Sequence, residues 1–138
     1  MEDALRVAGY RLTRQRKAIL NYLATTDAHP SAQQVFQEAK KDHPGLSLAT
    51  VYNTLETLAR MGLIKVLDFQ AMENRHETNL GPHINLICTS CGKIQDFEGG
   101  TTIHAGKVRE KFGFEVKDFR LEYYGICSAC GAQASRDS

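Results

Sequence analysis

The chain contains four cysteines, and they fall into two pairs, Cys88-x-x-Cys91 and Cys127-x-x-Cys130. A two-residue spacer lets both thiolates of a pair face one ion, and structural zinc takes four such ligands in a tetrahedron. Gly92 and Gly131 directly follow the pairs, where glycine relieves a tight turn. The spacing therefore predicts one structural Zn(II) bound by all four cysteines, and loss of this zinc is expected to unfold the second half of the chain.

Thiol redox chemistry in one Cys-x-x-Cys pair is the alternative, as in thioredoxin-like enzymes. Such chemistry needs a thiol of low pKa at the N-terminus of a helix that follows a strand. We expect neither pair in that context. In a reducing compartment the pattern also favours metal over disulfides.

A second group of residues could bind a transition metal. His29 directly precedes Pro30, and His83 lies in a loop with Glu77 and Asn85 near it, while Asp96 follows the first cysteine pair. Imidazole and carboxylate ligands suit Fe(II), Mn(II), Zn(II) or Ni(II). A ligand at His29 would connect the first half of the chain to its middle. The alternative is a set of unconnected surface histidines.

Positive charge is concentrated near the start of the chain. Net charge is only +1, from 17 Lys and Arg against 16 Asp and Glu, which excludes a uniformly basic nucleic-acid binder. Locally, however, four positive side chains occur in seven residues without an acid: Arg11, Arg14, Arg16 and Lys17. The last three could neutralise DNA phosphates. The alternative is a solvated helix face.

A helix predicted over 48–60 has the pattern of a DNA-recognition helix. Its apolar positions step by three and four residues and define one buried face: Leu48, Val51, Leu55 and Leu58. The opposite face is expected to carry Ala49, Thr50, Asn53, Glu56, Thr57 and Arg60, with Tyr52 on the flank. A methyl group can meet thymine and an Asn amide can pair with adenine, so we expect DNA contacts from Ala49, Thr50, Tyr52 and Asn53. The alternative is an ordinary amphipathic helix.

The elements that position these residues change in character along the chain. We expect helices at about 2–8, after Thr13, after Ser31 and over 48–60, and then a hairpin that turns between Gln70 and Arg75. Arg75 at that turn could enter a minor groove. Beyond the hairpin we expect strands near 84–87 and 93–97, a helix near 101–112, and a strand over 114–124.

The predicted fold class is α+β. A winged helix-turn-helix over 1–79 and a hinge at 80–82 lead into a small α/β domain over 83–131 that the zinc stabilises, and 132–138 form a frayed tail. With 42% hydrophobic and 24% charged residues among 138, the composition is that of a globular protein and excludes a disordered chain. No apolar run reaches the ~18–20 residues of a membrane span. The start carries acids, unlike a signal peptide, so a cytoplasmic protein is expected.

Several of these motifs together resemble the ferric uptake regulator (Fur) family. Thr13-Arg14-Gln15-Arg16 and Ala28-His29-Pro30-Ser31-Ala32 are similar to the start of its members, and Ser47 through Leu55 is similar to their recognition helix. The segments Ile87–Ile94 and Tyr124–Cys130 are similar to their zinc knuckles. The resemblance runs in order from about Glu2 to Gly131.

The resemblance implies a homodimeric, metal-activated transcriptional repressor of palindromic, AT-rich double-stranded operators. It implies no enzyme activity, no small-molecule substrate and no membrane. The structural zinc falls on the four cysteines, and the second half of the chain forms the dimerisation domain. A regulatory Fe(II) or Mn(II) site that joins the two halves falls on His29, Glu77, His83, Asn85 and Asp96.

Two positions depart from the family pattern. Asn85 stands where the family usually has His, and an amide oxygen is a weaker ligand for a transition metal than imidazole. Glu77 stands where the peroxide-responsive branch usually has Asp and iron sensors have Glu. The four-cysteine site favours the peroxide branch, in which Fe(II) and peroxide oxidise the histidines that match His29 and His83. An iron-responsive repressor, and a repressor whose regulatory site has decayed at Asn85, remain alternatives.

Overall fold

The structure is a computed structural model that describes residues 1–69, 72–98 and 104–137. The chain folds as two compact units, Met1–Leu80 and Gly81–Ser138, and each is described by itself. The division falls within the stretch 80–82 that the sequence predicts as a hinge. In the part of the chain that is described, no helix is long and apolar enough to cross a membrane.

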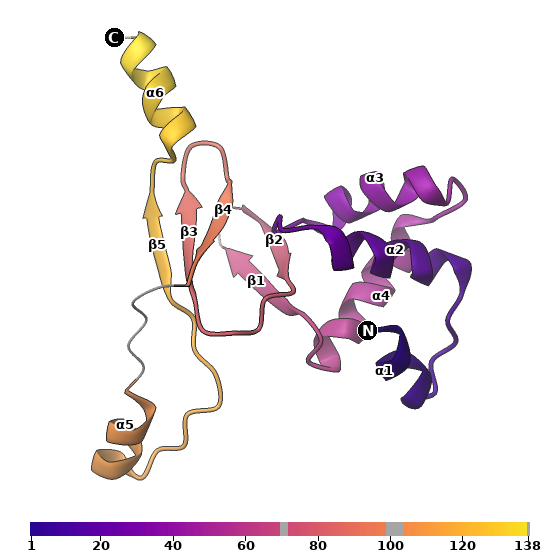
Figure 1. Cartoon of the computed structure of the whole chain (residues 1–138), viewed down its shortest axis with the longest axis horizontal. Coiled ribbons are helices and arrows are strands. Elements are labelled where there is room, and N and C mark those ends of the chain that lie inside the picture. Colours follow the sequence, from indigo (N-terminus) through magenta and orange to yellow (C-terminus); the bar gives the residue numbers. More distant parts are fainter. Residues whose placement is uncertain (70–71, 99–103, 138) are drawn as a thin grey trace. The chain divides into compact units, whose positions relative to one another are not determined.

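The first unit consists of helices followed by a hairpin (Figure 1). Its helices are α1 (Glu2–Val7), α2 (Arg14–Thr25), α3 (Ala32–Asp42) and α4 (Leu48–Arg60). Side chains of Thr13, Ser31 and Ser47 accept hydrogen bonds from the first turns of α2, α3 and α4, which fixes where these helices begin. At α3 the bond is reciprocal, because the Gln34 side chain accepts from the Ser31 N–H and completes a capping box.

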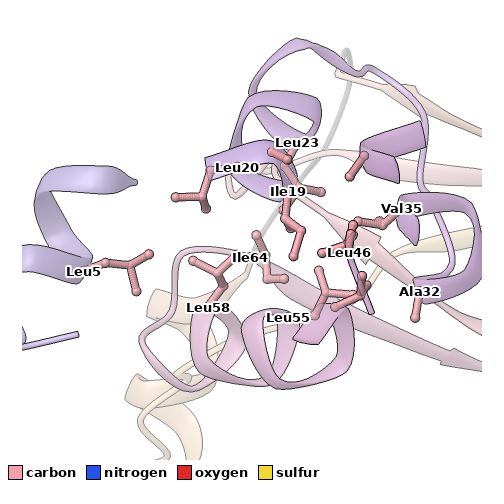
Figure 2. Packing of buried hydrophobic residues seen from close by; sticks show 13 residues of the cluster. Leu5, Ile19, Leu20, Leu23, Ala32, Val35, Leu46, Leu55, Leu58 and Ile64 are labelled. Atoms are coloured by element: carbon pink, nitrogen blue, oxygen red, sulfur yellow. The ribbon is translucent and has the colours of Figure 1, made fainter. Parts of the chain in front are cut away.

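The core of the first unit lies between α2, α3 and α4 (Figure 2). Ile19 of α2, Val35 of α3 and Val51 of α4 are fully buried. Leu55 and Leu58 continue the buried face of α4, at the positions that the apolar periodicity predicts. Leu5 of α1 also packs into this cluster (Figure 2).

The hairpin is longer than the sequence predicts. Strand β1 (Lys65–Phe69) pairs antiparallel with β2 (Met72–Glu77), with Lys65 opposite Glu77 and Leu67 opposite Arg75. The prediction that 70–75 form the turn was therefore wrong for 72–75. Met72 is half-buried, and Glu73 and Asn74 are polar and exposed. The segment therefore lacks the apolar alternation by which a strand is recognised in a sequence. Residues 70–71 lie outside the described part.

The second unit is built on a three-stranded sheet with the order β4-β3-β5. Strand β3 (Ile84–Cys88) is central, antiparallel to β4 (Ile94–Phe97) and parallel to β5 (Glu122–Gly125). Helices α5 (Ala105–Phe112) and α6 (Ser128–Asp137) complete the unit. The start of the helix expected at 101–112 falls on residues outside the described part, which resumes at His104.

Two expectations about the second unit were wrong. The last strand covers only 122–125 rather than 114–124, because the alternation is broken at Lys117-Asp118 and the Asp118 carboxylate accepts the N–H of Phe119. Residues 132–137, expected as a frayed tail, continue α6 to Asp137. Three alanines, the residue type with the highest helix propensity, favour this helix: Ala129, Ala132 and Ala134.

Candidate metal centres and nucleic-acid interface

The four cysteine sulfurs converge in the second unit. One Sγ atom from each of Cys88, Cys91, Cys127 and Cys130 lies within 4.8 Å of the others. The Sγ atoms of Cys91 and Cys127 are 3.8 Å apart. Zinc–sulfur bonds of about 2.3 Å in a tetrahedron require sulfurs about 3.8 Å apart. The donor set, its number and its spacing therefore fit a structural zinc ion.

The backbone around the knuckles favours thiolate. The N–H groups of Cys127 and Cys91 donate to Cys88 Sγ at 3.3 and 3.5 Å. These hydrogen bonds lower the pKa of Cys88 to about 6. The Ser90 side chain lowers the pKa of Cys130, but hydrogen bonds with the Cys127 and Cys91 thiols raise it more, to about 12. The cluster thus retains a proton that a cation would displace.

The second cysteine pair lies in a context that differs from the one predicted from the sequence. Cys127 follows β5 and directly precedes α6, so it lies at a helix N-terminus after a strand. Its pKa is lowered, chiefly by the backbone hydrogen bond from Cys130. A redox pair, however, needs its thiolate available to a substrate. Here the Cys88 and Cys91 sulfurs lie within 4.8 Å of the Cys127 sulfur, which favours metal binding over reaction with a substrate.

An imidazole–carboxylate pair lies in the first unit. His29 Nε2 is 3.5 Å from Glu77 Oε1, and both side chains are buried. His29 lies in the connection before α3, and Glu77 is the last residue of β2. We call these two residues the first ligand pair. Buried carboxylates near imidazole are typical of sites for divalent transition metals.

Three further donors converge in the second unit. His83 Nε2 is 3.1 Å from Asn85 Oδ1 and 3.8 Å from Asp96 Oδ1. Asn85 on β3 and Asp96 on β4 are direct partners in the sheet, which places their side chains together. His83 Nδ1 lies 2.7 Å from the Gly81 carbonyl oxygen and donates to it, so Nε2 is the ring atom that a neutral imidazole would offer to a metal. We call His83, Asn85 and Asp96 the second ligand group, because an imidazole nitrogen, an amide oxygen and a carboxylate oxygen meet there.

The outward face of α4 is largely as expected. Ala49, Asn53 and Glu56 are exposed, and Tyr52 is 56% exposed. Thr50 is half-buried, and its hydroxyl lies 2.8 Å from Ser47 Oγ at the helix cap.

Thr57 corrects the predicted face. Its side chain is buried, and its Oγ1 donates to the Asn53 carbonyl oxygen at 2.9 Å. The hydrogen-bonding requirement of this hydroxyl is therefore met within the helix, as is common for Thr in helices.

The cations at the start of α2 lie in two environments. Arg14 and Lys17 are exposed, whereas Arg16 is half-buried over the Tyr10 ring and donates to the Arg11 carbonyl oxygen at 2.5 Å. The first turn of α2 carries no acid. Positive charge at a helix N-terminus opposes the helix dipole, so this arrangement favours a bound anion.

Arg75 lies elsewhere than the sequence predicts. It is within strand β2, opposite Leu67, and not at the hairpin turn. Its Nε donates to the carbonyl oxygen of His29. The next residue, His76, is buried and contacts the Pro30 carbonyl oxygen. Burial lowers the pKa of His76 more than this hydrogen bond raises it. No sequence signal could show these contacts, because the partners are 46 residues apart.

Comparisons with known proteins agree with this geometry. Residues 7–124 match the ferric uptake regulator family. The "Peroxide-responsive repressor PerR" of Staphylococcus aureus is 37% identical over 128 residues, which cover 92% of this chain and 86% of that protein. A solved "zinc-bound manganese uptake regulator" is 30% identical with a TM-score of 0.71, covering 91% of this chain and 97% of that one. PerR from Streptococcus pyogenes is 33% identical with a TM-score of 0.52, covering 93% and 88%.

Proposed function

Because the chain belongs to the ferric uptake regulator family, we propose that it is a metal-dependent DNA-binding repressor that senses peroxide. The observation that carries this proposal is the buried imidazole–carboxylate pair of the first unit, the same unit that presents the exposed face of α4. Peroxide is proposed as the signal because relatives are named for responding to peroxide or sensing it.

The first unit is proposed to bind double-stranded DNA as a winged helix-turn-helix. α4 enters the major groove with Ala49, Thr50, Tyr52 and Asn53 facing the bases. Phosphates are contacted by Arg14, Arg16 and Lys17, whose position at the start of α2 favours anions. Arg75 joins this surface through its charge, although from the body of β2. Palindromic, AT-rich operators follow from the family resemblance.

The metal sites have different roles in this proposal. Zn(II) on the four cysteines stabilises the second unit. Fe(II) or Mn(II) would be held jointly by the first ligand pair and the second ligand group, so that binding would constrain one unit against the other. Fe(II) bound there would supply the redox chemistry that cleaves the O–O bond of hydrogen peroxide. In sum, the His29 or His83 ring gives up two electrons and gains one peroxide oxygen, and the other oxygen leaves as water. The oxidised ring would be a poorer ligand, so the constraint and the DNA would be released.

A homodimer is proposed on the exposed apolar surface of the second unit. α5 has no buried residue, and Phe112 on it is 72% exposed. On β5, which pairs only with β3 in the described sheet, Tyr123 and Tyr124 are also largely exposed. Apolar surface of this kind and open sheet edges are usually covered by a partner. A second copy of the chain also matches the two-fold symmetry of a palindromic operator.

The metal requirement is tested by fluorescence anisotropy under anaerobic conditions. Zinc-containing protein is titrated against DNA from the region upstream of its own gene, with and without Mn(II). We expect tight binding only with added Mn(II), because the joint ligand set must be filled. Equally tight binding without Mn(II) would mean that Asn85 has uncoupled DNA binding from metal, and the proposal would fail.

Tyr52→Ala is expected to weaken operator binding by about 1–3 kcal/mol, the effect of losing one base contact. Tyr52 is largely exposed on α4, so the fold should be unaffected. The measurement is operator affinity at saturating Mn(II), with the melting temperature as a check. Lys40→Ala, on the exposed side of α3, is the control and should bind as the native chain does. Unchanged affinity of Tyr52→Ala would remove this residue from the interface.

Asn85→His is expected to tighten Mn(II) binding by about tenfold, because imidazole is a stronger ligand than an amide oxygen. The side chain at 85 already faces His83 Nε2. Isothermal titration calorimetry on zinc-loaded protein measures the change. An exposed substitution on the same sheet, Gln95→His, serves as the control. If Asn85→His binds Mn(II) no better than the native chain, Asn85 does not face the ion.

An iron-responsive repressor is the second candidate, and Glu77 favours it, because iron sensors of the family carry Glu there. This candidate uses the same residues and the same DNA surface. It differs in the signal: DNA is released when Fe(II) is removed, and the histidines stay chemically unchanged after exposure to peroxide.

A further inference from the structure

Two residues of β2 that are outside both ligand sets hold the backbone next to His29. The Arg75 Nε–H donates to the His29 carbonyl oxygen. The His76 N–H donates to the Pro30 carbonyl oxygen at 2.9 Å, and its ring Nδ1 lies 2.8 Å from the same oxygen. Consecutive carbonyl groups at 29 and 30 are therefore fixed by consecutive side chains at 75 and 76.

The fixed segment is short and already restricted. Pro30 has its φ angle locked by the ring, and a residue before proline is confined to extended conformations. His29 therefore has few backbone conformations, and the two carbonyl contacts select among them. Since an acceptor carbonyl requires a proton on His76 Nδ1, that ring acts as a donor there. All of these contacts lie inside the first unit.

The strand that holds His29 also supplies its partner ligand. Glu77 directly follows His76, and its Oε1 is 3.5 Å from His29 Nε2. We propose that Arg75 and His76 are positioning residues that set the distance between the two ligands of the first ligand pair. The inference rests on the proposed metal-dependent function. It assigns to Arg75 a role through its Nε–H that is separate from any contact of its charge with DNA.

Matched substitutions separate the hydrogen bonds from side-chain size and charge. Gln places an amide N–H where Arg has Nε–H, so Arg75→Gln keeps the donor and loses the charge, whereas Arg75→Met loses both. Asn likewise places an amide N–H where His has Nδ1–H, so His76→Asn keeps that donor and His76→Leu removes it. The four variants are made in the full, zinc-loaded chain.

The readout is Mn(II) affinity without DNA, by isothermal titration calorimetry, together with the melting temperature and zinc content. We expect Arg75→Met and His76→Leu to weaken Mn(II) binding by about tenfold or more, as loss of an orienting contact does. Arg75→Gln and His76→Asn should bind Mn(II) nearly as the native chain does. Co(II) absorption in the loaded protein should change only in the donor-deleted pair, a spectroscopic change that lost stability alone would not produce.

His29→Ala distinguishes failure of the regulatory metal site from failure of the positioning role of Arg75 and His76. If His29→Ala binds Mn(II) as well as the native chain, the proposed regulatory site is wrong. If His29→Ala binds weakly but both donor-deleted variants keep native affinity, only the positioning role is overturned. The same conclusion follows if Arg75→Gln and His76→Asn lose as much affinity as Arg75→Met and His76→Leu, because the hydrogen bonds would then not be the cause.

Discussion

Cys88→Ser and Cys130→Ser are each expected to lose the zinc ion and to unfold the second unit. Structural zinc sites contribute about 10–16 kcal/mol of binding free energy, far more than a unit of this size gains from its own core. Cys88 is the buried member of the cluster, and its Sγ accepts two backbone N–H groups, which fixes the first knuckle against the second.

Three measurements check this prediction: zinc content per chain, far-ultraviolet circular dichroism, and oligomeric state by sedimentation. Helix signal from the first unit should remain, because its core lies between α2, α3 and α4. Gln95→Ala, an exposed change on β4 and outside the proposed dimer surface, should keep zinc and oligomeric state and is the control. If Cys88→Ser forms a folded dimer without zinc, the four cysteines do not form a structural zinc site.

Local patterns predicted the helices of the first unit well, and α4 best of all. Its apolar spacing and its Ser47 cap are contained within the helix itself, and the structure begins and ends α4 at the predicted residues. Thr57 was wrongly predicted on the exposed face, because its residue type is polar. Its hydroxyl can nevertheless be buried, since it donates to a backbone carbonyl of its own helix. The error came from residue type, since the helical period was correct.

Sheet elements were predicted less well, because their limits depend on partners far along the chain. Strand β5 is short since only Glu122–Gly125 pair with β3, a limit that its own sequence does not carry. The cysteine spacing, in contrast, predicted a convergence that the structure shows, because a Cys-x-x-Cys knuckle is a local device. The carbonyl contacts of Arg75 and His76 could not be predicted, because they connect segments 46 residues apart.

The regulatory ligands are an intermediate case. Histidine and carboxylate residues were identified by type, but only the family resemblance grouped them. The structure then places His29 beside Glu77 within the first unit and gathers His83, Asn85 and Asp96 within the second. Each set alone offers too few strong ligands for a transition metal, since the first has two donors and the second includes an amide. We therefore propose that both sets bind one ion jointly and that this binding controls the affinity for DNA.

Peroxide treatment of the anaerobically Fe(II)-loaded protein is expected to add one oxygen atom to His29 or His83. Operator affinity should then fall to the level of non-specific binding, a loss of at least about 10³-fold. Tryptic mass spectrometry locates the added oxygen, and anisotropy measures the affinity on the same sample. Protein loaded with Mn(II) is the control, and it should keep both histidines unmodified and its DNA bound.

The two readouts together separate the candidate signals. Oxygen on His29 or His83 with loss of DNA supports peroxide sensing, because the altered ring no longer completes the joint ligand set. If the histidine peptides stay unmodified and only a chelator releases the DNA, the protein senses iron rather than peroxide, the alternative that Glu77 favours. His43, half-buried at the C-cap of α3 and outside both ligand groups, tests for indiscriminate damage. Oxidation of His43 to the same extent as His29 and His83 would contradict a site-directed reaction, because only residues at the bound iron should react.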